Sequence, residues 1–417
     1  LDRSDLEALP AEGDATQLDI PLAQRRADLL AEALQRRSSH WPEHHRQALS
    51  HWRAQQSFWL PDHCRFMVLR RLHQQRPWWE WPTALARRSR SALGQVDRDQ
   101  AVALEREALL QWQLQHQWQR LLEHARARGV EVIGDLPFYV AHDSADVWSR
   151  RRLFSVRSDG RLTLQSGVPP DYFSATGQLW GTPVYRWPLH RLTRFHWWMR
   201  RLQRQLELLD LLRLDHFRAL EAAWCVPGGD STAEHGVWRR SPGRALLRRL
   251  ERVHGSAPLP LIAEDLGVIT PAVEALRDRH RLPGMKILQF AFDGNDANPY
   301  LPDNFRGSDW VVYTGTHDNA TCIGWWNALG DEERRRLEAA MGGPVQAPGW
   351  QLLELALRSS ADLAVVPLQD LLGLGDEARF NSPGTTTGNW CWRLSGSLET
   401  ITGPLQGMGE MARRYGR

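Results

Sequence analysis

The chain has 417 residues, 42% of them hydrophobic and 24% charged, with a formal net charge of +3. These values are typical of a soluble globular protein, and the length suffices for a large domain with insertions. No window approaches the roughly 20 apolar residues that cross a membrane, and no basic tail is present, so we expect neither membrane insertion nor nucleic-acid binding.

Residues 1–128 have a mainly helical pattern. Apolar residues at helical spacing predict a helix over residues 21–37, and a longer polar-faced helix over residues 99–128. A turn is expected near Gly94. We therefore predict a mainly helical subdomain in this part of the chain.

From Gly129 onward, strand-like runs alternate with helical ones, as they do in parallel βα units. Six runs have this character: residues 130–133, 211–214, 259–263, 285–292, 310–313 and 363–368. The interval of about 142–190 is rich in Gly, Pro and aromatic residues, and we predict that it forms a lid over an active site. The alternation predicts an α/β fold of the (β/α)8 TIM-type barrel class, with mostly helical insertions.

The numbers and positions of the cysteines and tryptophans lead to two further expectations. Cys64, Cys225, Cys322 and Cys391 are scattered without a C-x-x-C pair and no secretory leader opens the chain, so we expect reduced thiols and a cytoplasmic location. The 21 tryptophans either fill a large core or stack against sugar rings, and composition does not separate these two uses.

Three segments place an acid shortly after a predicted strand: Asp215, Glu264 and Asp318. Arg213 lies two residues before Asp215, so both side chains project from the same strand face, and a guanidinium there lowers the pKa of a carboxyl. Glu264 emerges from an apolar strand, where partial desolvation raises the pKa of a carboxyl. Enzymes that cleave glycosidic bonds typically use two carboxyls whose pKa values are shifted in opposite directions.

The third acid, Asp318, would hydrogen-bond a sugar and stabilise positive charge at the anomeric carbon, and His216 and His317 would bind hydroxyls. Structural ion pairs at strand ends are the alternative for any single segment, but three such segments together favour a catalytic site. The histidines have no metal-binding spacing, and neither a G-x-S-x-G elbow nor a phosphate-binding loop is present. We therefore expect no metal and no cofactor.

The segments together resemble the 4-α-glucanotransferases of glycoside hydrolase family 77, also called amylomaltases or disproportionating enzymes. The resemblance runs from about Phe58 to Arg393. It is carried by residues 133–148, 167–183, 284–292 and 380–390, and by the helical strings 58–62 and 77–82.

The resemblance implies a role for each site residue. Asp215 would be the nucleophile, Glu264 the acid and then the base, and Asp318 the stabiliser of the transition state. The residues expected to bind substrate are Arg213, His216, His317, Asp135, Asp171, Gln178, Trp180, Phe290, Asn381 and Pro383. For Asp171 and Trp180, anchoring of the loop is the alternative role.

The chain departs from the family pattern at Ala219, which stands where glycine is usual, and near Ala223 and Cys225. It also opens at Leu1 with only six strand-like runs, so we expect the first two barrel strands and a tyrosine-bearing acceptor loop to be missing. The predicted organisation is a helical subdomain over 1–128 and a catalytic barrel, strands 3 to 8, over 129–417.

The predicted function is transfer of α-1,4-glucan (maltodextrin) segments to an acceptor by retaining double displacement. Two alternatives stay open at this point. One is a retaining α-glucan hydrolase of the same clan, and the other is a glucan-binding fragment without turnover. The sequence does not indicate an oligomeric state.

Overall fold

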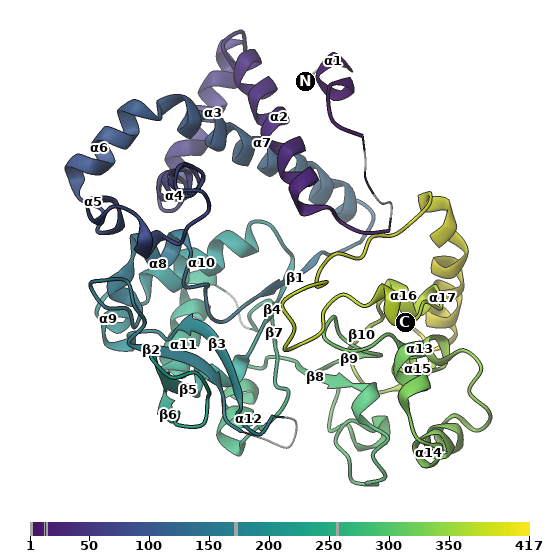
Figure 1. Ribbon diagram of the computed structural model, residues 1–417. Coiled ribbons are helices and arrows are strands. Elements are labelled where there is room, and N and C mark those ends of the chain that lie inside the picture. Colours follow the sequence, from purple (N-terminus) through teal and green to yellow (C-terminus); the bar gives the residue numbers. More distant parts are fainter. Residues whose placement is uncertain (1–2, 12, 14–15, 171–173, 256–257) are drawn as a thin grey trace. The chain divides into compact units, whose positions relative to one another are not determined.

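A computed structural model describes residues 3–11, 13, 16–170, 174–255 and 258–417. The chain folds as two compact units: Leu1–Pro10 with Gln24–His280, and Ala11–Ala23 with Arg281–Arg417 (Figure 1). Each unit contains one three-stranded parallel sheet. Within the described ranges, no helix combines the length and apolar character that a membrane crossing requires.

The first unit begins with helices drawn in purple and blue in Figure 1. They are α1 (Arg3–Glu7), α2 (Ile20–Ser38), α3 (Glu43–Gln55), α4 (Leu60–Leu72), α5 (Thr83–Ala86), α6 (Arg90–Asp99) and α7 (Ala101–Arg126). Leu49 and Trp52 of α3, Cys64 of α4, and Leu109 and Trp112 of α7 form a common apolar core. The two long helices predicted from the sequence are therefore present as α2 and α7.

The turn predicted near Gly94 is wrong, because Gly94 lies inside α6. This helix begins after Ser89, whose hydroxyl accepts a hydrogen bond from the amide of Ala92 at 3.2 Å and so caps the first turn. Glycine costs only about 1 kcal/mol inside a helix, and a capped helix absorbs that cost.

The parallel sheet of the first unit has the order β1-β4-β7, formed by β1 (Ile133–Leu136), β4 (Leu211–Leu214) and β7 (Leu261–Ala263). The run predicted at residues 130–133 starts three residues too early. The amide of Val132 donates to the carboxylate of Asp210 at 2.8 Å, so strand pairing begins only at Ile133, opposite Leu211.

A four-stranded antiparallel sheet, β3-β2-β5-β6, was missed by the sequence reading. It consists of β2 (Leu164–Val168), β3 (Gln178–Pro183), β5 (Ala222–Pro227) and β6 (Val237–Arg240). Two of these strands lie in the interval predicted to be a lid. Gly167 allows the close approach of β3, because a Cβ there would lie 2.2 Å from the carbonyl oxygen of Gln178.

Five further helices complete the first unit: α8 (Ala145–Ser149), α9 (Trp187–Leu192), α10 (His196–Leu206), α11 (Gly243–His254) and α12 (Pro271–Arg279). Trp148, Trp197 and Trp198 are fully buried, whereas Trp180 is 36% exposed and Trp390, in the second unit, is 55% exposed. Many of the tryptophans therefore serve the core, and a few remain open to solvent.

The second unit contains the sheet β10-β9-β8, formed by β8 (Gly284–Ile287), β9 (Trp310–Tyr313) and β10 (Leu363–Val365). The predicted run 285–292 is too long, because pairing with β9 ends at Ile287 and a 3-10 turn follows over Leu288–Phe290. The helices, green to yellow in Figure 1, are α13 (Cys322–Ala328), α14 (Asp331–Met341), α15 (Pro348–Arg358), α16 (Leu368–Leu371) and α17 (Thr402–Arg414).

The structure thus shows a mixed α/β chain in which a parallel strand overlaps each of the six predicted runs. The division into two units differs from the predicted boundary at residues 128 and 129, and the helical subdomain stays a prediction. A closed eight-stranded barrel is likewise a prediction.

Candidate active site

The strand ends of the first unit bring Asp135, Asp215 and Glu264 onto three adjacent chain segments. Asp135 in β1 lies opposite Arg213 in β4, and Leu214 lies opposite Ala263 in β7. Backbone bonds extend this ladder past the strand ends, since the Asp215 amide donates to Leu136 and the Glu264 amide donates to Leu214. The carboxyl groups therefore leave the sheet at the same edge.

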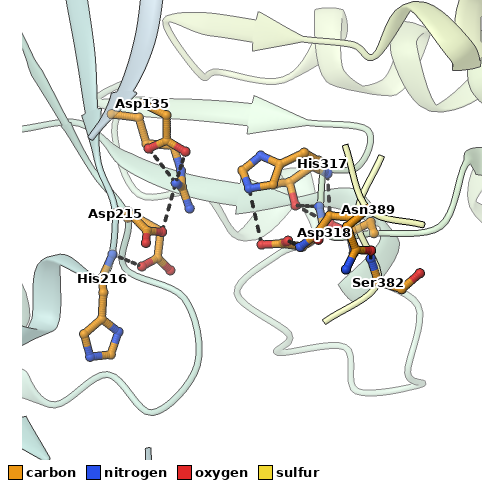
Figure 2. A network of polar contacts seen from close by, with 12 residues as sticks. Asp135, Asp215, His216, His317, Asp318, Ser382 and Asn389 are labelled. Carbon is orange, nitrogen blue, oxygen red and sulfur yellow. Dashed lines mark hydrogen bonds and ion pairs between the residues drawn. The ribbon is translucent and has the colours of Figure 1, made fainter. Parts of the chain in front are cut away.

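Arg213 links two of these acids (Figure 2). Its Nη1 donates to both carboxylate oxygens of Asp135, at 2.8 and 2.7 Å, and lies 3.0 Å from Oδ1 of Asp215. Burial lowers the pKa of this guanidinium, but the nearby charges of Asp135, Asp215 and Glu264 outweigh burial and raise it overall. The arginine stays charged, and it fixes Asp215 in a polar setting.

Glu264 has the opposite environment, with only 8% of its surface exposed. Burial is the main reason that the pKa of its carboxyl is raised to about 7. Arg213 and two backbone amides act against this rise, and the charge of Asp215 adds to it. These amides belong to His216, which donates to Oε2 at 2.6 Å, and Leu266, which donates to Oε1 at 2.9 Å. A carboxyl of this kind carries a proton near neutral pH and can release it.

His216 adopts the left-handed backbone conformation, with φ of +50°. This bend turns the chain after Asp215 so that its amide reaches Glu264. Burial, and then the charge of Arg218, lowers the pKa of the imidazole to about 3. The neutral ring meets Trp180 edge-on at 4.7 Å, and its Nε2 is buried with no hydrogen-bond partner in the part of the chain that the structure describes.

Asp318 lies in the second unit, on the loop after β9. Asn381 Nδ2 donates to its Oδ1 at 2.5 Å, and Nε2 of His317 lies 3.4 Å from its Oδ2 (Figure 2). Arg379 Nη2 donates to its backbone carbonyl at 2.7 Å, while Arg379 Nε donates to the carbonyl of Asn381 at 2.8 Å. The carboxylate is thus held from two sides.

The remaining predicted binding residues lie on surface loops and one strand. Gln178 and Trp180 are on β3, where Trp180 Nε1 donates to the Gln178 side chain at 3.3 Å. Phe290 is 45% exposed at the end of its 3-10 turn, and Pro383 is exposed on the loop that carries Asn381. Asp171 lies outside the described residues.

The sequence reading missed Arg379 and Trp390. Arg379 supports Asp318 and Asn381, and the Trp390 ring lies 5.1 Å from that of His317. Trp390 belongs to the quoted stretch 380–390 and Arg379 immediately precedes it. A search for a cation next to a predicted site loop would have selected Arg379.

Three comparisons place the chain among known proteins. The family model described as 4-alpha-glucanotransferase matches residues 5–399. The chain is 44% identical to the 4-alpha-glucanotransferase of Thermus thermophilus, over 88% of this chain and 75% of the relative. It is 45% identical to that of Synechocystis sp., over 83% and 71%.

A solved structure agrees with these sequence matches. The amylomaltase from Streptococcus agalactiae in complex with acarbose superposes with a TM-score of 0.93 at 31% identity. The match covers 100% of this chain and 84% of that one.

Proposed function

Since this chain belongs to the 4-alpha-glucanotransferase family, we propose that Asp215, Glu264 and Asp318 carry out its transfer reaction by retaining double displacement. The chain is an enzyme of this class, which transfers segments of α-1,4-glucans. What remains to be assigned is the role of each residue.

In the first step, a carboxylate oxygen of Asp215 bonds to the anomeric carbon while the glycosidic C–O bond breaks. Glu264 gives its proton to the departing oxygen, which leaves as the shortened glucan, and Glu264 becomes a carboxylate. In the second step, this carboxylate takes the proton of an acceptor hydroxyl, whose oxygen bonds to the anomeric carbon and displaces Asp215. The two inversions give net retention.

The observation that carries this assignment is the contrast between two neighbouring carboxyls. Asp215 contacts a charged guanidinium at 3.0 Å and its side chain is 42% exposed, whereas Glu264 is buried with a pKa of about 7. A nucleophile must be ionised and a general acid must be protonated at the working pH. The two environments meet these opposite demands.

Asp318 is proposed to stabilise positive charge at the anomeric carbon and to bind sugar hydroxyls together with His317. Arg213, His216, Asp135, Asp171, Gln178, Trp180, Phe290, Asn381 and Pro383 are proposed to position the donor glucan or to flank it. His216 is suited to this because its neutral ring has an unused, buried Nε2. The Streptococcus agalactiae amylomaltase was solved in complex with acarbose, and we propose that this chain also binds acarbose.

The proposal includes the wider organisation of the protein. The parallel strands belong to a (β/α)8 barrel with strands β2 and β3 in a lid, and residues 1–128 form a helical insertion. We further propose a cytoplasmic location, although the Arabidopsis relative is named as chloroplastic or amyloplastic, and maltodextrin as the partner, with no nucleic acid or membrane.

Incubation of the chain with maltotriose tests the transfer reaction. We expect glucose and a ladder of longer dextrins at a constant number of reducing ends, because transfer makes one glycosidic bond for each one that it breaks. Product sizes and reducing ends are measured in the same samples. A rise in reducing ends with time would identify a hydrolase instead, and binding of maltotriose without any product would identify a glucan-binding fragment.

Asn381→Ala is expected to reduce kcat/KM for maltotriose by about 10- to 100-fold, because a hydrogen bond to a charged group is worth about 1.5–3 kcal/mol. The variant removes the donor that holds Oδ1 of Asp318. Asn389→Ala is the matched control, since Asn389 accepts from the Ser382 amide within the same loop and does not bond to Asp318. Equal losses in both variants would mean that the loop, and not the carboxylate, was disturbed.

A further inference from the structure

The first unit contains a cavity of about 540 Å3 whose lining includes five arginines: Arg87, Arg88, Arg150, Arg151 and Arg152. None of the proposed catalytic or glucan-binding residues lines it, and neither do aspartate or glutamate. The chain uses arginine for all but one of its cations. Composition therefore explains why these cations are arginines, but it does not explain why five of them surround one cavity.

Three short elements bring the arginines together, at the left of Figure 1. Arg87 and Arg88 follow α5, Arg150 ends α8, and Arg151 and Arg152 form the turn that comes next. Cations often lie at helix C-termini, where they offset the helix dipole. Here α5 has four residues and α8 has five, so neither helix has a dipole that would account for such a cluster.

Protein contacts fix three of the five side chains. Arg88 lies 2.6 Å from Asp62 and stacks over Trp148 at 4.2 Å. Arg150 donates to the Ser149 hydroxyl at 2.9 Å and lies 4.2 Å over the Phe58 ring. Arg151 donates to the Ser158 carbonyl at 3.3 Å. These contacts hold Arg88, Arg150 and Arg151 in one wall of the cavity. The ring faces of Trp148 and Phe58 are already covered by arginines.

The positive charge of this wall is poorly compensated. Asp62 pairs with Arg88 but also lies 3.4 Å from Arg65, and the charge of Asp146 acts on Arg150. Across the described ranges, the guanidinium groups of Arg87 and Arg152 make no hydrogen bond or ion pair. Burial is the main cause that lowers the pKa of Arg151, and the charges of Arg87 and Arg88 add to it.

We propose that this cavity binds a phosphate group, supplied as inorganic phosphate or as the phosphomonoester of a sugar or nucleoside. A phosphate dianion offers two negative charges and several acceptor oxygens, which guanidinium forks bind in a bidentate manner. A neutral glucan leaves the repulsion between the arginines uncompensated. The side chains of Arg87 and Arg152 would bind the anion directly. Arg88, Arg150 and Arg151 would contribute positive charge at fixed positions around it.

Calorimetric titration of the full chain with inorganic phosphate tests the proposal, at constant ionic strength set with chloride. Arg87→Ala/Arg152→Ala removes the two arginines whose guanidinium groups have no partner among the described residues, so the fold should persist, and thermal unfolding checks this. The control is Arg90→Ala/Arg157→Ala, which removes the same charge from exposed arginines outside the cavity.

We expect the Kd for phosphate to rise at least about tenfold in the cavity variant and less than about twofold in the control. Equal weakening in both variants, or no binding by the unaltered chain at millimolar phosphate, would overturn the proposal. Titrations with glucose 1-phosphate and with adenosine monophosphate identify the source. Tighter binding of either one than of inorganic phosphate assigns the phosphomonoester, and equal binding assigns the phosphate group alone.

Discussion

Replacing Asp215 by asparagine is expected to lower kcat for glucan transfer by about 10^4-fold or more, in line with losses on removing other catalytic nucleophiles. The amide has nearly the same shape but no negative charge with which to attack the anomeric carbon. Arg213 keeps its two bonds to Asp135, so the strand ends should stay in place. Transfer from maltotriose and binding of a non-reacting dextrin are measured on the same preparation.

The control for this variant is Asp278→Asn. Asp278 lies 2.7 Å from Arg277 and its side chain is 62% exposed, so the control also removes a carboxylate from an arginine without changing one of the three acids. It should transfer glucan at nearly the normal rate. An Asp215→Asn enzyme that kept more than about a tenth of the activity would show that another group is the nucleophile.

The second large effect concerns pH. We expect kcat/KM for transfer to fall as pH rises through about 7, because Glu264 must be protonated to act as the acid. Its pKa is raised to about 7 chiefly by burial, so the carboxyl is mostly protonated below this pH and mostly ionised above it. Initial rates measured from mildly acidic to alkaline pH give this part of the pH–rate profile. A rate that stays level well above neutral pH would contradict the role given to Glu264.

Stability provides an independent check of the same group. A carboxyl whose pKa is raised on folding, from 4.5 to about 7, stabilises the fold fully below its unfolded pKa and loses this contribution as pH rises through its folded pKa. The free energy of unfolding, relative to that of Glu264→Gln, should therefore fall by about 3 kcal/mol between these two pH values.

The glutamine variant also turns an amide NH2 toward one of the two backbone N–H groups that Glu264 accepts from. That cost does not depend on pH, so it cancels from the slope. A difference in stability that does not change with pH would mean that Glu264 titrates as an ordinary glutamate. This outcome would leave the transfer reaction itself untouched, since the maltotriose assay measures it separately.

Local signals in the sequence were sufficient to select the three acids that are proposed to be catalytic. A β-strand buries an apolar run, and the polar residues after it mark the strand end. Asp215 and Glu264 directly follow such runs and Asp318 lies on the loop after one, so all three could be selected without a structure. β4 and β9 have the predicted bounds. The long helices α2 and α7 follow from their apolar spacing in the same way.

The sheet β3-β2-β5-β6 could not be predicted in this way. The segments of β2 and β3 each contain glycine, and such sequences have weak strand propensity. β2 becomes a strand because it pairs with β5, which is distant in the chain, and β3 then pairs with β2. The start of β1 was also set from a distance, by the hydrogen bond between Val132 and Asp210.

The sequence by itself determined which residues are proposed to carry the chemistry, because residue type and position after a strand are local properties. Only the tertiary structure decided their hydrogen-bond partners, their burial and their pKa values. It paired Arg213 with Asp135 across two strands, buried Glu264 against the amides of His216 and Leu266, and held Asp318 with Asn381. A pKa depends on burial and on charges a few ångströms away, and these distances exist only after folding.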